Sequence, residues 1–202
     1  MIRLPDGKMK SREGNTVDAD SLADLMHGEA KKLLVERYPD LDEKEIIFRA
    51  EAIAMAAIKL FILKYDATKD FIFDRESSLS FEGETGPYLQ YTLARVMKVL
   101  SKASTKPMTS FVHLTTTTEK DLLVQLADFP ETVQRAAEQY QPALVARYLM
   151  ELARLLNTYY HHEKILVEEN DLQQERLALV SAVKEILTTG LKLLGIEALE
   201  EM

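Results

Sequence analysis

The chain of 202 residues contains no cysteine. Disulfide bonds, thiolate metal sites and a cysteine nucleophile are therefore all excluded. Disulfides are characteristic of oxidising compartments, so their exclusion agrees with a reducing environment. We expect a cytoplasmic protein.

The sequence also lacks a long hydrophobic run. Charged residues interrupt every apolar segment well before the roughly 18–20 positions that a membrane span requires. The opening residues, MIRLPDGKMKSREG, have no apolar core of the kind found in secretory signals. We therefore expect no membrane partner.

An excess of basic residues is missing as well. Lysine and arginine number 25 against 33 acidic residues, which gives a net charge of −8. Proteins that hold duplexes through backbone phosphates usually carry a basic patch or excess, so this balance argues against non-specific nucleic-acid binding. It leaves open a local site for unstacked bases, where stacking contributes about 1–3 kcal/mol per base.

Common catalytic and nucleotide-binding motifs are absent too. The chain has no GxSxG, P-loop, GxGxxG or HExxH sequence. The segment NTYYHH, residues 157–162, has adjacent histidines, which do not turn both rings toward one ion on a helix. We expect no metal site. Tyr159 is expected in the core, whereas Tyr160 and His161 are candidates for a polar surface.

Apolar residues recur at intervals of three and four along most of the chain, which is the period of an amphipathic helix. They make up 47% of the sequence, enough for a packed core. Residues 70–74, DFIFD, are expected to form a strand or an extended segment, and residues 104–118 a connection. The expected fold class is all-α: a helical bundle preceded by a polar, glycine-containing segment. Helices are expected from about 22–34 and 46–62, from Pro87 onward, and over 119–127, 130–140, 142–163 and 172–194.

The segment GETGPYLQYTLARV, residues 83–96, predicts a helix that begins at Gly-Pro. At about 100° per residue, Tyr88, Tyr91 and Arg95 lie within roughly 60° of one another on one face. Tryptophan is absent, so this face concentrates scarce aromatic groups. Two interpretations fit this face: a core surface with wet hydroxyl groups, or a stacking platform for a flat, anionic ligand.

The segment GKMKSREGN, residues 7–15, places three cations between glycines: Lys8, Lys10 and Arg12. Such a loop can close over a polyphosphate and stabilise charge on a leaving pyrophosphate. The alternative is a solvated basic tail. At the other end, Met202 closes a short acidic tail to which pattern alone gives no function.

Two motifs occur together in one known family. SFEGETGPYLQY, residues 80–91, and LLGIEALEEM at the end of the chain resemble the C-terminal part of arginyl-tRNA synthetases, which are class I enzymes. The resemblance covers nearly the whole chain and is weakest over residues 104–118. It implies that residues 1–59 are the end of a catalytic domain with a KMSKS-like loop and connecting helices. It implies that residues 60–202 are a DALR-type helical anticodon-binding domain.

The resemblance also implies roles for particular residues. The loop residues Lys8, Lys10 and Arg12 match the ATP-facing signature, although Lys10 stands where the family has serine. The positions that would hold unstacked anticodon bases are Tyr88, Tyr91, Arg95, Asn157, Tyr160 and Met202.

The nucleotide-binding domain with its HIGH signature is not present in this sequence. The resemblance therefore implies a fragment that binds tRNA(Arg) but is inactive alone. The parent would use ATP with magnesium to activate arginine and then transfer it to tRNA(Arg). Two alternatives stay open at this point: a stand-alone helical module that binds another RNA or a protein, and a purely structural scaffold. The oligomeric state is not predicted.

Overall fold

Helices dominate the computed structural model, which describes residues 2–3, 18–103, 105, 111–199 and 201–202. The all-α prediction is confirmed. A parallel pair of two-residue strands, β1 (Ile2–Arg3) and β2 (Phe71–Ile72), adds a short sheet at one edge. The DFIFD segment therefore does contain a strand.

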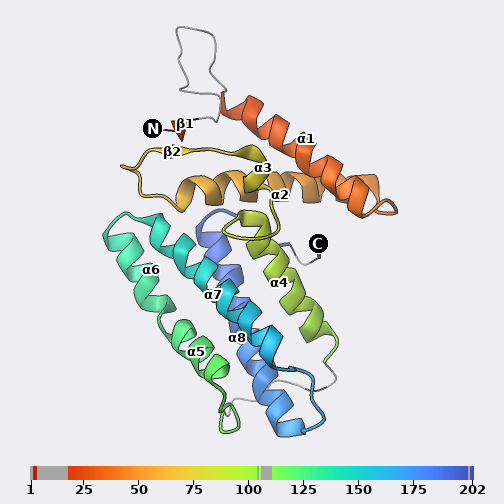
Figure 1. The fold of residues 1–202 in the computed structure, drawn as a ribbon, viewed down its shortest axis with the longest axis vertical. Helices are drawn as coiled ribbons and strands as arrows, with labels where there is room; N and C mark the ends of the chain where they lie inside the picture. The colour runs from red at the N-terminus through yellow and green to blue at the C-terminus, as the bar shows by residue number, and fades with distance from the viewer. Residues whose placement is uncertain (1, 4–17, 104, 106–110, 200) are drawn as a thin grey trace.

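The first layer of the structure is a helix pair, α1 (Ala19–Arg37) and α2 (Glu43–Leu63). Acidic side chains cap both helices: Asp18 accepts a hydrogen bond from the Ser21 amide at 2.7 Å, and Asp42 accepts one from the Lys44 amide at 3.1 Å. Figure 1 shows α2 lying across one end of the remaining helices. A single-turn helix, α3 (Arg75–Ser78), follows β2 beside this pair.

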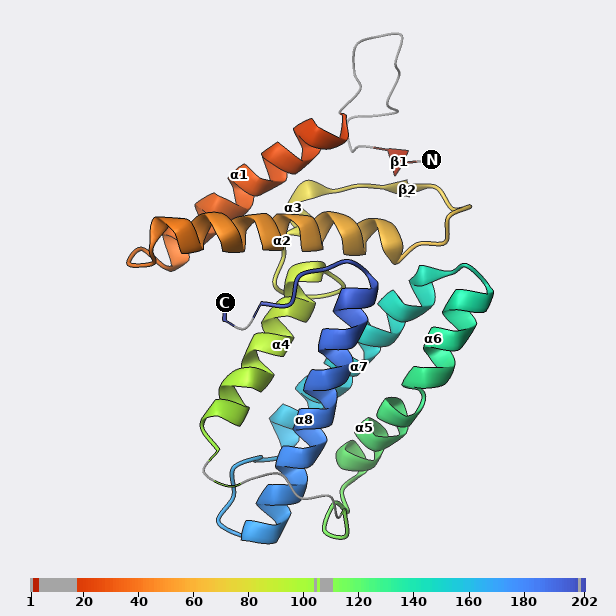
Figure 2. The ribbon, with the colours of Figure 1, turned by 180° about the vertical axis from the view of Figure 1, so that it is seen from behind.

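The second layer is, within the described residues, a bundle of five helices. Figures 1 and 2 show α4, α7 and α8 running side by side, with α5 and α6 along one flank. The bounds of these helices are α4 Gly86–Ser101, α5 Thr117–Ala127, α6 Phe129–Glu138, α7 Pro142–His162 and α8 Asn170–Leu193.

Two apolar cores hold these layers together, and α2 contributes to both. Its Ile53 and Ala57 pack with α1 and Phe73, whereas Ala56 and Leu60 pack into the bundle. The sequence-based division between residues 59 and 60 would therefore fall inside a helix that serves both cores. That division remains a prediction.

The start of α4 is fixed against α2 by sequence-specific features. The Thr85 hydroxyl accepts a hydrogen bond from the Tyr88 amide at 3.1 Å, and Pro87 occupies the first turn as expected. A Cβ atom at Gly86 would lie only 2.1 Å from the Ala56 carbonyl oxygen. Only glycine allows this close approach, which sets the position of α4 on α2.

Helix ends elsewhere agree with the sequence apart from small shifts. Thr116 and Glu119 form a capping box, so α5 begins two residues before the expected Glu119. Gly195 has φ of 65°, and the Ile196 amide donates to the Leu191 carbonyl at 2.9 Å. This arrangement ends α8 at the expected glycine.

The described residues contain neither a membrane-spanning helix nor a cluster of metal ligands. None of the helices is long and apolar enough to cross a membrane. In the same part of the chain, no group of three or more His, Asp or Glu side chains is placed to hold a metal ion.

Candidate functional site

Helix α4 separates an apolar face from a polar aromatic face. Leu89, Leu93 and Val96 are fully buried in the bundle. Tyr88, Tyr91 and Arg95 are only half-buried. Because the period of the helix brings the latter three to one side, they form a continuous face that reaches solvent.

Asn157 on α7 joins two residues of this face. The Arg95 Nη1 donates to the Asn157 Oδ1 at 2.9 Å, and the Asn157 Nδ2 donates to the Tyr88 hydroxyl. One amide side chain therefore fixes both an arginine and a tyrosine of α4. The rotamers of both are held before any ligand arrives, which lowers the entropy cost of binding.

Arg95 lies between two aromatic rings. Its Cζ is 5.8 Å from the centre of the Tyr91 ring and 4.9 Å from that of Tyr160. Both distances are within the range of a cation–π interaction. Among the residues that the structure describes, no carboxylate forms an ion pair with Arg95. The charge of this guanidinium is therefore available to an anionic ligand.

The Tyr160 hydroxyl is the least satisfied polar group of the site. It is buried and has no hydrogen-bond partner among the described residues. Burial raises the pKa of Tyr160 to about 12, against the opposing effect of the Arg95 charge. The hydroxyl therefore stays protonated at neutral pH and can donate or accept one hydrogen bond.

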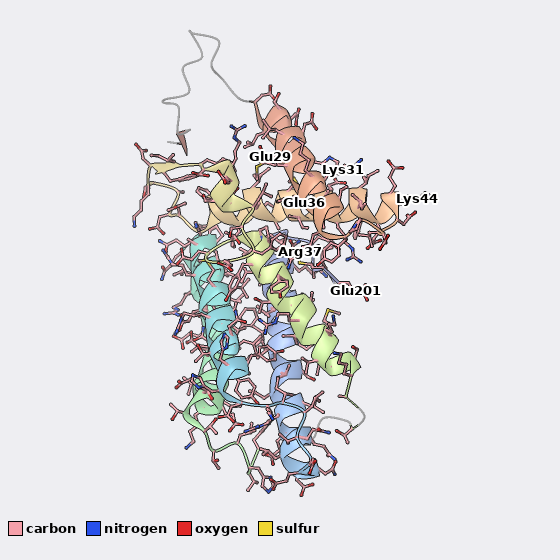
Figure 3. All side chains as sticks on the ribbon, turned by 45° about the vertical axis from the view of Figure 1, so that its right-hand side comes forward. Glu29, Lys31, Glu36, Arg37, Lys44 and Glu201 are labelled. Atoms are coloured by element: carbon pink, nitrogen blue, oxygen red, sulfur yellow. The ribbon has the colours of Figure 1, made fainter. Side chains whose placement is uncertain are left out.

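Tyr91 and the end of the chain meet on the side of the site that faces α1. Met202 and Tyr91 line the same narrow pocket. Phe81 stands edge-on to Tyr91 with ring centres 6.4 Å apart, and the Arg37 Cζ lies 5.5 Å from the centre of the Phe81 ring. Figure 3 shows Arg37 and Glu201 on the same side of the molecule as α4.

These neighbours of Tyr91 include two groups that the sequence did not single out, Arg37 and Phe81. Phe81 belongs to the quoted SFEGETGPYLQY motif, so its place in the motif was a usable signal. Arg37 comes from the end of α1. Nothing in the local sequence indicates that this helix end lies beside α4.

The remaining expected residues fall into two groups. Lys8, Lys10 and Arg12 lie outside the described residues. Tyr159 is fully buried, as expected for a core residue, and His161 is exposed at the end of α7.

A buried ionic cluster supports the end of α7 behind the site. Arg176 of α8 donates to Glu119 through Nε at 2.8 Å, to Glu163 through Nη2 at 2.8 Å and to the Lys164 carbonyl through Nη1 at 2.6 Å. It thus ties α5 and α8 to the residues just after Tyr160. Sequence reasoning missed this cluster, because its members are far apart along the chain.

With this geometry established, similarity to known proteins identifies the family. The model of the DALR anticodon binding domain matches residues 89–202, which include most of the site. The chain belongs to this family. As a DALR domain, it places Tyr91, Arg95, Asn157, Tyr160 and Met202 inside the matched region, while Tyr88 lies one residue before it.

The resemblance to arginyl-tRNA synthetases is also confirmed. The arginine–tRNA ligases of Halothermothrix orenii and Phocaeicola vulgatus are 36% and 41% identical to this DALR domain protein over its entire length. The chain spans 36% and 35% of those two relatives, or about a third of their length. The structure of Thermus thermophilus arginyl-tRNA synthetase matches all of this chain and 34% of its own, with a TM-score of 0.90 and 33% identity.

Proposed function

We propose that this chain binds the anticodon loop of tRNA(Arg) as the C-terminal part of an arginine–tRNA ligase. The observation that carries the proposal is the arrangement of Arg95, held by Asn157 between the rings of Tyr91 and Tyr160 without a carboxylate partner among the described residues. Family membership supports an anticodon as the ligand. Similarity to ligases over the whole chain supports tRNA(Arg) as its source.

The aromatic residues bind unstacked bases in this proposal. The loop of an RNA exposes base faces that stack on tyrosine rings, and each such contact is worth about 1–3 kcal/mol. Tyr88 and Tyr91 supply ring faces along α4, and the Tyr160 ring holds the Arg95 guanidinium beside them. Met202 forms part of the wall beside Tyr91.

Arg95 provides a local positive charge in a chain whose net charge is negative. The net charge of −8 repels an RNA backbone at long range. A guanidinium without an acidic partner attracts a phosphate or the carbonyl edge of a base at close range. The proposal therefore describes recognition at one site, in which a few contacts to splayed bases replace a broad basic surface.

The longer enzyme would join arginine to tRNA(Arg), using ATP and magnesium. Lys8, Lys10 and Arg12 would face the ATP phosphates there, as the sequence resemblance implies. This part of the proposal rests on sequence alone, since these three residues lie outside the described ones. Its test is an assay of aminoacylation by the longer enzyme with Lys8→Ala, which should slow arginine activation without weakening tRNA binding.

Anticodon binding is tested by titrating the chain with a tRNA(Arg) anticodon stem-loop. Tyr91→Ala should weaken binding by about 1–3 kcal/mol, which corresponds to roughly 5- to 150-fold in Kd. Changing the middle anticodon base should weaken binding of the wild-type chain. Tyr140→Ala is the matched control, because Tyr140 is 91% exposed after α6 and outside the site. Binding that is weakened neither by Tyr91→Ala nor by the base change would contradict the proposal.

A further inference from the structure

The C-terminal tail, which the structure describes over residues 195–199 and 201–202, does not continue α8. It turns at Gly195 and runs across α4 on the side that faces α2, as Figure 2 shows. Ile196 and Leu199 are both only 3% exposed. Ile196 packs in the core of the bundle, and Leu199 packs in the core of the first layer. The tail is thus a packed segment that bridges the two cores.

One buried side chain fastens this tail to the helix that carries the candidate site. Gln90 of α4 is completely buried. Its Nε2 donates to the Glu197 carbonyl at 2.8 Å and to the Ala52 carbonyl of α2 at 3.2 Å. The Gln90 Oε1 has no partner among the described residues. Among the described residues, only the NH₂ group of this amide forms hydrogen bonds.

Two more exposed contacts hold the tail before and after Glu197. Lys59 of α2 donates to the Gly195 carbonyl, and the Arg49 Nη2 lies 3.5 Å from a carboxylate oxygen of Glu201. Both are at or near the surface. Because the Gln90 side chain is completely buried, its bond to the Glu197 carbonyl is the contact that water competes for least.

The consequence of this attachment appears at the chain end. Met202 packs against the first core and lines the pocket that also contains Tyr91 and Phe81. Gln90 immediately precedes Tyr91 in the sequence but points to the tail. A single turn of α4 therefore carries both the Tyr91 ring and the group that fixes the segment beside it.

We propose that Gln90 is a positioning residue for the RNA site: it holds the C-terminal tail so that Met202 forms a wall beside the Tyr91 ring. The inference rests on the proposed function and adds a residue that contacts no RNA itself. Without the Gln90 donor, the Glu197 carbonyl loses its buried partner and the tail detaches more often, although Ile196 and Leu199 still pack in the two cores. The Tyr91 ring then loses a neighbour that limits its rotamers, and a stacked base is held less tightly.

The first test measures release of the tail. Gln90→Met keeps the length and burial of the side chain but removes the donor. Carboxypeptidase should remove Met202 from this variant at least about tenfold faster than from the wild type, because only a detached tail enters the protease. Thr92→Val is the matched control: Thr92 is also buried on α4, and its hydroxyl has no partner among the described residues. It should leave the cleavage rate unchanged.

The second test measures binding of the tRNA(Arg) anticodon stem-loop in a double-mutant cycle. Gln90→Met should weaken binding about tenfold in the full chain and have no further effect in a chain that ends at Leu199. Thr92→Val should not weaken binding in either chain. Equal weakening by Gln90→Met in both chains would overturn the inference, because Gln90 would then act without the tail.

The outcomes separate this inference from the proposed function. Should the wild-type chain fail to bind the stem-loop, the proposed function and the affinity effect both fall. Should the wild type bind while Gln90→Met changes neither cleavage nor affinity, only the role of Gln90 is refuted. If Gln90→Met does not fold, Leu199→Ala loosens the same tail by another route. It must then accelerate removal of Met202 and weaken binding for the inference to hold.

Discussion

Two arginines approach the C-terminal part of α7 from different helices and meet opposite surroundings. Arg176 of α8 is buried and contacts the carboxylates of Glu119 and Glu163. Arg95 of α4 is half-buried and contacts the neutral Asn157 amide and aromatic rings. One charge is neutralised within the fold. The other is held in place, but no carboxylate among the described residues neutralises it.

The difference separates structural support from ligand binding. Burying a charge is costly, so a buried guanidinium must be paired and hydrogen-bonded, as Arg176 is. A guanidinium that lies over rings near solvent keeps most of its attraction for a phosphate or a base. The two residues should therefore respond differently to the same substitution. One should affect stability, and the other should affect RNA affinity.

Arg176→Met should have the largest effect. It leaves the Glu119 carboxylate, which is fully buried, without its cationic partner. Removing one partner of a buried ion pair typically destabilises a protein by about 3–5 kcal/mol. Chemical denaturation measures this change.

Arg154→Met is the control. Arg154 also forms two hydrogen bonds with one carboxylate, that of Glu151, but this pair lies at the surface. It should cost no more than about 1 kcal/mol. Equal losses in the two variants would mean that burial does not distinguish the pairs.

Arg95→Met should have the opposite effect: a small loss of stability and a large loss of RNA affinity. The free energy of unfolding should fall by only about 1 kcal/mol, since the variant loses one hydrogen bond and two ring contacts near solvent. Affinity for the tRNA(Arg) anticodon stem-loop should fall by about tenfold or more, because the unneutralised charge is removed from the site. Chemical denaturation and titration with the stem-loop, carried out on the same protein sample, measure the two effects. A stability loss as large as that of Arg176→Met, with affinity unchanged, would assign Arg95 to the fold.

Local periodicity was enough to predict which residues of α4 share a face, but it left a core surface and a stacking platform both open. The helical period alone brings Tyr88, Tyr91 and Arg95 to one face, and the Gly-Pro pair marks where α4 begins. The resemblance to a known family added Asn157, which contacts two of these three residues in the structure. Spacing within one helix cannot indicate a partner from another helix.

Contacts between distant segments were the part that the sequence could not predict. Gln90 looks like an ordinary polar residue of α4, and only the path of the tail reveals that it lies against the Glu197 carbonyl. The same is true of Arg176, whose carboxylate partners come from two other segments. Buried polar residues in an otherwise apolar stripe were the available signal. Their partners depend on how the helices pack, which no local pattern encodes.

A third ionic contact joins His113 to Glu175, and it differs from the two arginine sites because a histidine can lose its charge as the pH rises. Glu175 precedes Arg176 on α8 and is fully buried, but its partner His113 is exposed. The His113 Nδ1 lies 2.9 Å from a Glu175 oxygen, and the amides of Val112 and His113 donate to the same carboxylate. The contact is thus intermediate between the buried Arg176 cluster and a surface pair.

The pH dependence of this contact should be the smallest of the three effects. The hydrogen bond to Glu175 raises the pKa of His113 above 6.5 in the folded chain. The stabilisation is therefore complete below pH 6.5 and is lost as the pH rises through the folded pKa. The pKa of Glu175 is lowered because its hydrogen bonds to His113 and Val112 outweigh the opposing effect of burial, so this carboxylate stays ionised across that range. Denaturation of the wild type and of His113→Gln from about pH 6 to pH 9 measures the contribution. The difference in unfolding free energy between the wild type and His113→Gln should shrink with rising pH. A constant difference would show that the ion pair adds nothing beyond the two hydrogen bonds from the Val112 and His113 amides.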